Sequence, residues 1–227
     1  MKALFVAGGT GGHVYPALEV AREFKNSGIQ IYWIGKENSL EHEFSKREGF
    51  SFKPIKSSGF RKKSLIKKIL SIFYLIISFI KSIYILLRIK PKFIFCFGGY
   101  LSLGPGLASA VLRVPLFIHE QNSVAGSANK LLANLATEVF EGFPNSFKRN
   151  LENINFVGNP VRHEITSFTD TNKTVSSTKK FKLLILGGSQ GSTQLNSIVM
   201  DSLSEVIDKS NWEIVHQTGE ADMEDLN

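Results

Sequence analysis

A glycine-rich turn near the N-terminus constrains the fold of this chain more than any other feature. Residues 8–13 (GGTGGH) follow the apolar run Ala3–Ala7 and precede a helical pattern that begins near Tyr15. A strand, a glycine turn and a helix in this order bring backbone N–H groups and a helix N-terminus close to a phosphate. The same order recurs where the apolar run 183–186 leads into 187–192 (GGSQGS). Two such turns predict two Rossmann-like halves that serve one phosphate-bearing ligand.

Short apolar runs and helical patterns alternate along the first two thirds of the chain. Strands are predicted near 2–7, 30–35, 51–55, 93–97, 115–119, 137–140 and 154–157, and helices near 15–27, 39–48, 64–88, 104–112, 126–135 and 145–150. This alternation is typical of an α/β fold whose mostly parallel sheet is covered on both faces. Ligands of such sheets bind at the carboxyl ends of the strands.

A polar segment divides the chain. Residues 166–180 are rich in Thr, Ser and Lys and lack periodicity, which predicts a linker between a domain at 1–165 and a second one at 181–227. The second domain is expected to contain a strand at 181–186, a helix at 191–209 and a strand at 212–216. It is shorter than the roughly 100–150 residues of a Rossmann-like half. We therefore expect an incomplete C-terminal domain, and a chain that is either a fragment or a gene product cut short.

Composition sets the class of protein. The 227 residues are 43% hydrophobic, which is enough for a core and argues against disorder. Cys96 is the single cysteine and lies in an apolar run, so we expect it in the core of a protein from a reducing, cytoplasmic compartment. The first 15 residues carry no secretion signal.

The net charge of +7 comes from one region. Between Gly49 and His119 there are 12 lysines and arginines and no acidic residue, whereas the other 15 basic residues face 20 acidic ones. This region includes the basic and apolar segment 61–92. A transmembrane span, a fully buried helix and an amphipathic helix on an anionic membrane surface are the alternatives. Lys81 inside the apolar run disfavours the span, and the basic flanks favour the membrane surface. The segment is aliphatic and lacks base-reading residues, so no nucleic acid is expected as a partner.

Three further segments follow predicted strands and are candidates for chemistry: 98–100 (GGY), 119–122 (HEQN) and 158–162 (GNPVR). Four consecutive polar side chains at 119–122 are costly unless a ligand or a buried network satisfies them. Tyr100 either contacts a ligand or packs. Arg162 either holds an anion or fixes the hinge through backbone carbonyls. His13 either contacts a diphosphate and accepts a proton, or caps the turn.

Other site chemistries find no support in the sequence. The five histidines are scattered and no acidic pair has ligand spacing, so no metal site is expected. There is neither a P-loop lysine nor a nucleophile elbow. A nicotinamide oxidoreductase is disfavoured because no acidic residue follows the second strand at the position that binds an NAD ribose.

Taken together, the five motifs GGTGGHVYPA (8–17), GGY (98–100), HEQN (119–122), VGNPVR (157–162) and GGSQG (187–191) closely resemble the MurG family of bacterial peptidoglycan glycosyltransferases. The resemblance spans nearly the whole chain, in order. It implies a two-domain GT-B fold and an inverting hexosyltransferase without a cofactor. It also implies transfer of N-acetylglucosamine from UDP-N-acetylglucosamine to the 4-hydroxyl of the muramoyl sugar of lipid I. This reaction forms lipid II at the cytoplasmic face of the cell membrane, and serves cell-wall synthesis, cell shape and division.

The resemblance also assigns site residues. It makes His13 the candidate general base. The residues expected to bind the acceptor are Thr10, Gly11, Gly12, His13, Tyr100, Glu120, Gln121 and Asn122. The residues expected to bind the donor are Thr10, Gly11, Gly12, Asn122, Arg162 and Ser189.

The sequence departs from the family in one respect. The remaining donor-domain motifs would lie beyond Asn227, so the chain as it stands is expected to be inactive or nearly so. Two alternatives stay open. One is a membrane-docked acceptor-binding module without catalysis, and the other is a related lipid-acceptor transferase, such as one that glycosylates diacylglycerol.

Overall fold

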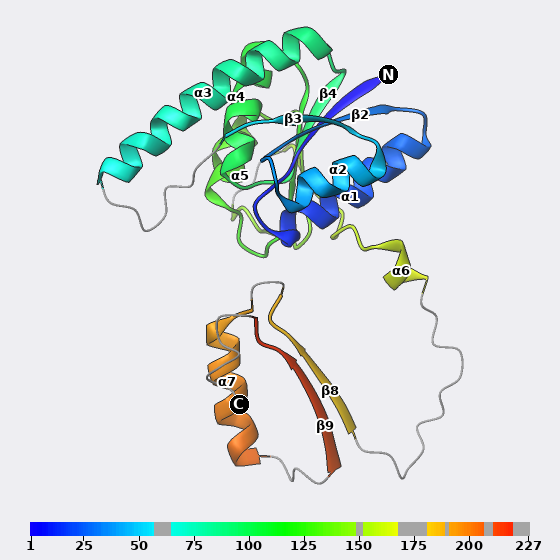
Figure 1. The fold of residues 1–227 in the computed structure, drawn as a ribbon, viewed down its shortest axis with the longest axis vertical. Coiled ribbons are helices and arrows are strands. Elements are labelled where there is room, and N and C mark those ends of the chain that lie inside the picture. The colour runs from blue at the N-terminus through cyan, green and yellow to red at the C-terminus, as the bar shows by residue number, and fades with distance from the viewer. Residues whose placement is uncertain (57–64, 149–151, 168–180, 189–190, 207–210, 220–227) are drawn as a thin grey trace. The chain divides into compact units, whose positions relative to one another are not determined.

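The computed structural model describes residues 1–56, 65–148, 152–167, 181–188, 191–206 and 211–219 (Figure 1). The chain forms two compact units, Met1–Phe168 and Thr169–Asn227. Most of the linker predicted at 166–180, the donor residue Ser189 and the basic residues 61–63 lie outside the described residues.

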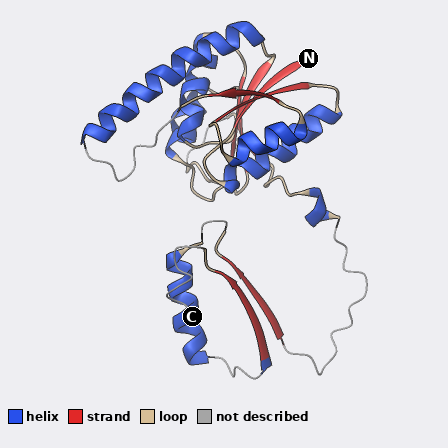
Figure 2. Ribbon diagram, in the orientation of Figure 1, coloured by secondary structure: helices blue, strands red, loops and turns tan. Residues whose placement is uncertain are grey.

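The first unit contains a parallel sheet of seven strands in the order β3-β2-β1-β4-β5-β6-β7 (Figure 2). The strands are β1 (Lys2–Val6), β2 (Gln30–Gly35), β3 (Ser51–Pro54), β4 (Phe93–Cys96), β5 (Leu116–Glu120), β6 (Glu138–Glu141) and β7 (Ile154–Phe156). The direction in which strands are added reverses between β1 and β4. In doubly wound sheets this reversal opens the crevice in which ligands bind. The α/β fold with a parallel sheet that the sequence predicts is confirmed.

Helices cover both faces of this sheet (Figure 1). They are α1 (Gly11–Asn26), α2 (Leu40–Glu48), α3 (Leu65–Ile89), α4 (Leu103–Val111), α5 (Ser127–Leu132) and α6 (His163–Thr166), with 3-10 turns η1 (Tyr100–Ser102) and η2 (Ala133–Leu135). The helices α1 and α2 pack on one face, whereas α3, α4 and α5 pack on the other.

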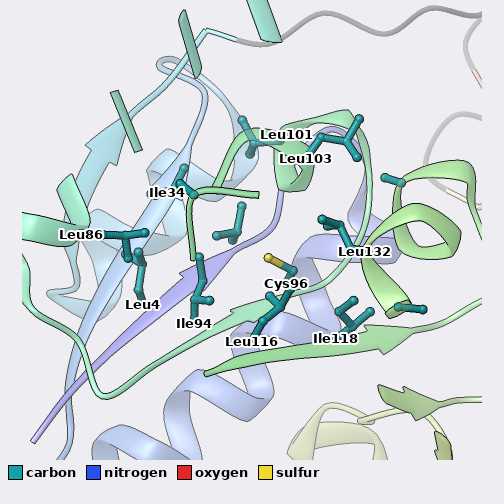
Figure 3. Close-up of a cluster of buried hydrophobic side chains, with 14 of the residues drawn as sticks. Leu4, Ile34, Leu86, Ile94, Cys96, Leu101, Leu103, Leu116, Ile118 and Leu132 are labelled. Atoms are coloured by element: carbon teal, nitrogen blue, oxygen red, sulfur yellow. The ribbon is translucent and has the colours of Figure 1, made fainter. Parts of the chain in front are cut away.

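Alternating side chains of the strands build two cores, one on each face. In β1, Leu4 points into the core beneath α3 and α4, and its neighbour Phe5 points into the core beneath α1 and α2. Figure 3 shows the first of these cores, in which aliphatic side chains from β1, β4 and β5 surround Cys96. Cys96 is fully buried, as predicted, and burial raises the pKa of its thiol to about 12. The second core is richer in aromatic rings. The ring centroid of Phe5 lies 6.1 Å from the ring centroids of both Trp33 and Phe97.

Helix α3 buries three serines and exposes many of its large apolar side chains. Ser71, Ser78 and Ser82 are buried. Helix α4 approaches α3 so closely at Ser78 that only small residues fit there. A Cβ added at Gly104 would overlap the side chain of Ser78 and stand 3.0 Å from the backbone N of Phe79. The large side chains that face outward are Ile69, Leu70, Ile72, Phe73, Ile76, Ile77, Ile80, Tyr84 and Leu87. The fully buried helix, one of the alternatives, is therefore wrong.

The start of one helix differs from the prediction, and one predicted helix does not form in its described part. Helix α1 begins at Gly11 rather than near 15, because Thr10 is extended and its carbonyl accepts the N–H groups of His13 and Val14. The helix predicted at 145–150 is wrong in its described part, which forms turns. There the carboxylate of Glu141 accepts the N–H groups of Asn145 and Phe147 at 3.0 and 3.2 Å, and Asn145 adopts a left-handed φ of 61°.

The second unit contains β8 (Phe181–Leu186), α7 (Thr193–Val206) and β9 (Trp212–Gln217). The two strands are parallel and pair along their whole length. Asn196 of α7 donates through Nδ2 to the carbonyl of Thr218, at 2.9 Å, which fastens the helix to the end of β9. This β-α-β unit agrees with the elements predicted for residues 181–216.

Candidate active site

The glycine turn after β1 presents the N-terminus of α1. The hydroxyl of Thr10 makes no capping hydrogen bond with the first turn of the helix and lies 3.2 Å from Nδ1 of His13 instead. Thr10 and Gly12 are exposed, whereas Gly11 is buried. A helix N-terminus without a side-chain cap favours an anion, because its N–H groups and the helix dipole both point toward it.

A second glycine turn follows β4 and touches the first. Gly98 and Gly99 adopt φ values of 89° and 73°, which glycine reaches at no steric cost. A Cβ at Gly98 would stand 3.2 Å from Cδ2 and 3.3 Å from Nε2 of His13. The absence of a side chain at 98 therefore lets the imidazole pack against this turn. Because β1 and β4 are neighbours, the two turns meet where the strand order reverses.

His13 is set up to accept a proton. Burial lowers the pKa of its imidazole, and the negative charge of Glu120 opposes that effect in part. The ring is therefore neutral at neutral pH. When Nδ1–H donates to the Thr10 hydroxyl, Nε2 carries the free lone pair that a general base needs.

The carboxylate of Glu120 serves the scaffold. Glu120 is 1% exposed. Its Oε1 accepts the backbone N–H and the Nδ2–H of Asn122 at 2.9 and 2.8 Å, and its Oε2 accepts the N–H of Gly126 and the Nδ2–H of Asn129, both at 2.9 Å. These four donors fix the loop 122–126 against the end of β5. Glu120 lies behind the wall of the site and supports it.

His119 and Gln121 form a buried network with the segment 158–162. Gln121 donates through Nε2 to Nδ1 of His119 at 3.0 Å, which leaves Nε2–H of His119 to donate to the carbonyl of Gly158, also at 3.0 Å. Asn159 donates to the carbonyl of Gln121 at 3.1 Å. Burial lowers the pKa of His119. The polar run 119–122 is thus satisfied mainly by a buried network, and Asn122 is its exposed member.

A cavity of about 580 Å³ opens beside His13. Of the residues predicted for the site, His13, Tyr100 and Asn122 line it, together with Gly99. Most of the wall comes from a segment that the sequence analysis missed. It comprises Ser123, Val124, Ala125, Gly126, Ser127, Ala128 and Lys130. The segment follows HEQN directly, and its mixture of small residues and one lysine carries no motif of its own.

Arg162 does not line this cavity. Its guanidinium is exposed and stands 5.0 Å from the ring centroid of Tyr15, which is a cation–π contact. Its backbone carbonyl accepts the N–H groups of Ile165 and Thr166 at the start of α6. Contact of Arg162 with the donor remains a prediction. Among the described residues, no three His, Cys, Asp or Glu side chains gather as they do around a metal ion.

Comparison with known families decides the identity of the chain. The N-terminal domain of glycosyltransferase family 28 matches residues 3–141, and the C-terminal domain of the same family matches residues 182–227. The chain belongs to glycosyltransferase family 28.

Two curated relatives share the name UDP-N-acetylglucosamine–N-acetylmuramyl-(pentapeptide) pyrophosphoryl-undecaprenol N-acetylglucosamine transferase. The proteins of Pseudomonas syringae pv. tomato and Pseudomonas putida are 38% and 39% identical to this chain over 218 residues, which is 96% of it. The chain spans 60% of the length of these relatives.

Solved structures support the same assignment. The crystal structure of MurG from Acinetobacter baumannii matches with a TM-score of 0.74 and 29% identity, over 99% of this chain and 63% of that one. The Staphylococcus aureus MnaA–UDP structure matches with a TM-score of 0.62 and 13% identity, over 96% of this chain and 63% of that one. At this low identity the second match shows the fold alone. The GT-B fold class and the family predicted from the sequence are confirmed.

Proposed function

We propose that this chain supplies the acceptor half of an inverting glycosyltransferase. The reaction moves N-acetylglucosamine from UDP-N-acetylglucosamine to the 4-hydroxyl of the muramoyl sugar of lipid I and forms lipid II. The observation that carries the proposal is the cavity that brings His13, Tyr100 and Asn122 together in a chain about 38% identical to relatives named for this transfer. The expected role of the second unit, binding the UDP-sugar, rests on its match to the family C-terminal domain.

The chemistry follows from the state of His13. As the acceptor 4-hydroxyl attacks the anomeric carbon of the donor sugar, its proton passes to Nε2 of the neutral imidazole. The new carbon–oxygen bond forms on one face of the sugar while the bond to the UDP oxygen breaks on the other, so the configuration inverts. We expect Thr10, Gly11 and Gly12 to lie beside the diphosphate, because the N-terminus of α1 has no side-chain cap and suits an anion.

The outward face of α3 supports peripheral binding to the cytoplasmic face of the membrane. Residues 69–89 are long and apolar enough to cross a membrane by length and composition. The helix packs on α4, however, and contributes Ile85, Leu86 and Ile89 to the core. Lys81 and Arg88 are exposed on the helix, and Lys90 and Lys92 follow it. Such a face binds anionic lipid surfaces because its apolar side chains become buried in the lipid and its basic side chains are attracted to the negative charge.

A transfer assay tests the proposal. Labelled UDP-N-acetylglucosamine and a short-chain lipid I analogue are incubated with a chimera that joins residues 1–181 of this chain to the C-terminal domain of the Pseudomonas putida relative. We expect labelled disaccharide product, and its loss in His13→Ala of the chimera. Binding of the acceptor without transfer would favour the non-catalytic binding module. Glycosylation of diacylglycerol in its place would favour the related lipid-acceptor transferase.

A further inference from the structure

Lys130 is a residue of the cavity wall that the proposed function has not used. It lies in α5, and its backbone N–H donates to the carbonyl of Gly126 at 2.9 Å. Lys130 is exposed, and it is one of the residues that line the same cavity as His13, Tyr100 and Asn122. Among the residues that the structure describes, no carboxylate forms an ion pair with its ammonium group.

The rest of the lining carries no compensating negative charge. The wall from Asn122 to Ala128 is uncharged, and no Asp or Glu lines the cavity. The nearby carboxylate of Glu120 is not part of the lining, and it accepts hydrogen bonds from four N–H donors of neutral groups. Lys130 therefore brings a positive charge to a cavity lining that contains no carboxylate. Such a charge favours binding of an anion through charge-assisted hydrogen bonds.

The position of Lys130 is fixed by the residue before it. Asn129 is 1% exposed and donates through Nδ2 to Oε2 of Glu120 at 2.9 Å and to the carbonyl of His119 at 3.2 Å. These bonds fasten α5 to the end of β5. Lys130 thus belongs to the cavity wall on an anchored stretch of backbone.

We propose that Lys130 binds the diphosphate of the acceptor and makes the site selective for diphosphate-linked over uncharged lipid-linked sugars. The inference rests on the proposed function, because lipid I carries a diphosphate between its sugar and its lipid. The N-terminus of α1 offers N–H groups and a partial charge, whereas Lys130 offers a full counter-charge. The neutral imidazole of His13 adds none.

Acceptor binding by the full chain tests this assignment. Calorimetry measures the affinity for a water-soluble, short-chain lipid I analogue and for a matched analogue with a neutral linker in place of the diphosphate. We expect Lys130→Gln to weaken binding of the diphosphate analogue about tenfold, as loss of one charge-assisted hydrogen bond predicts. Binding of the neutral analogue should not change. Lys130→Arg should stay close to the parent, and Lys46→Gln, which removes an exposed lysine of α2, is the matched control.

The remaining outcomes overturn the assignment in different ways. Equal affinity of Lys130→Gln and the parent chain for the diphosphate analogue would leave Lys130 without a role. Equal weakening of both analogues would assign it to the sugar or the peptide. If Lys130→Gln weakened only the binding of UDP, measured in a parallel titration, Lys130 would be assigned to the donor site. If the parent chain bound neither analogue, the proposed function itself would fail. Thermal unfolding checks that Lys130→Gln stays folded, as its exposed position predicts.

Discussion

The two long helices on opposite faces of the sheet place their apolar residues in opposite ways. Helix α1 buries Val14, Ala17, Leu18 and Ala21 against the sheet and leaves Glu23 and Lys25 exposed. Its Arg22 pairs with Glu19 and with Glu48 of α2 at 2.7 and 2.6 Å. Helix α3 instead buries three serines against α4 and exposes a continuous row of isoleucine, leucine and phenylalanine side chains.

The comparison shows that the apolar face of a helix is not always the face that is buried. For α1 they coincide, since the apolar face is the one that the sheet covers. For α3 the close contact with α4 selects small side chains, much as helix contacts inside membranes do, and the larger apolar ones remain outside. An exposed apolar surface of this extent marks a binding surface rather than a core. The expectations below test that contrast, from the largest effect to the smallest.

The largest effect concerns membrane binding by α3. Replacing Ile72, Ile76 and Ile80 together by Ser should weaken binding to anionic phosphatidylglycerol vesicles by about 4.5 kcal/mol, because each lost side chain removes about 1.5 kcal/mol of apolar burial. Flotation with vesicles measures this change. The matched control replaces the exposed Phe156, Val157 and Ile165, which lie outside α3, by Ser. Equal losses in both triple variants would contradict a specific role for α3.

Truncating a buried side chain of α1 should lower stability far more than truncating an exposed side chain of α3. Leu18→Ala in α1 should lower the free energy of unfolding by about 3 kcal/mol, because Leu18 is 1% exposed and its truncation leaves a cavity. Ile80→Ala in α3 should change it by less than about 0.5 kcal/mol, because Ile80 is 61% exposed. Urea unfolding of both variants measures the pair. Similar losses would mean that α3 is covered in solution.

A side chain added at the contact between α3 and α4 should lower the free energy of unfolding. Gly104→Ala forces a Cβ against Ser78 and the backbone of Phe79, so we expect a loss of about 2 kcal/mol in the free energy of unfolding. Gly28→Ala is the comparison, because a Cβ at Gly28 would meet no neighbouring atom within 4 Å. The φ of Gly28 is positive, so this substitution should lower the free energy of unfolding through backbone strain alone. If Gly104→Ala proved neutral in urea unfolding, the small-residue packing described for α3 would be wrong.

The first turn of α1 should make stability depend on pH through His13. Burial lowers the pKa of His13 in the folded chain, so the unfolded chain binds the proton first as pH falls. The free energy of unfolding should therefore decrease from about pH 7 to pH 5, by at most about 1.4 kcal/mol per pH unit for one group. His119 contributes in the same direction. Urea unfolding across this range should show a smaller slope for His13→Gln.

The smallest effect separates two serines of α3. Ser82 donates through Oγ to the carbonyl of Ser78, so Ser82→Ala should cost about 1 kcal/mol. The hydroxyl of Ser78 is buried and has no hydrogen-bond partner among the described residues. Ser78→Ala should therefore be neutral or slightly stabilising in the same unfolding assay. The reverse ranking would show that Ser78 makes a bond with solvent or with another group.

Much of the fold could be predicted from local patterns, and the site only in part. The strands of the sheet are short apolar runs, and the two glycine turns follow β1 and β4 directly. The helix predicted at 145–150 is wrong in its described part because the carboxylate of Glu141 accepts the N–H groups of Asn145 and Phe147 and holds these residues in turns, which the apolar pattern does not reveal. Glu120 was expected at the acceptor, but its side chain supports the loop behind the wall. Lys130 was missed because only the anchoring of α5 brings it to the cavity.

The central claim is that the cavity beside His13 holds a diphosphate-linked muramoyl acceptor, and cross-linking tests it most directly. A short-chain lipid I analogue with a photoreactive group next to its diphosphate is irradiated with the full chain, and the labelled peptides are mapped by mass spectrometry. We expect labels in the segments 10–13, 98–100 and 122–130, and competition by unlabelled analogue. Labels confined to the second unit, or spread without competition over the surface, would contradict the claim.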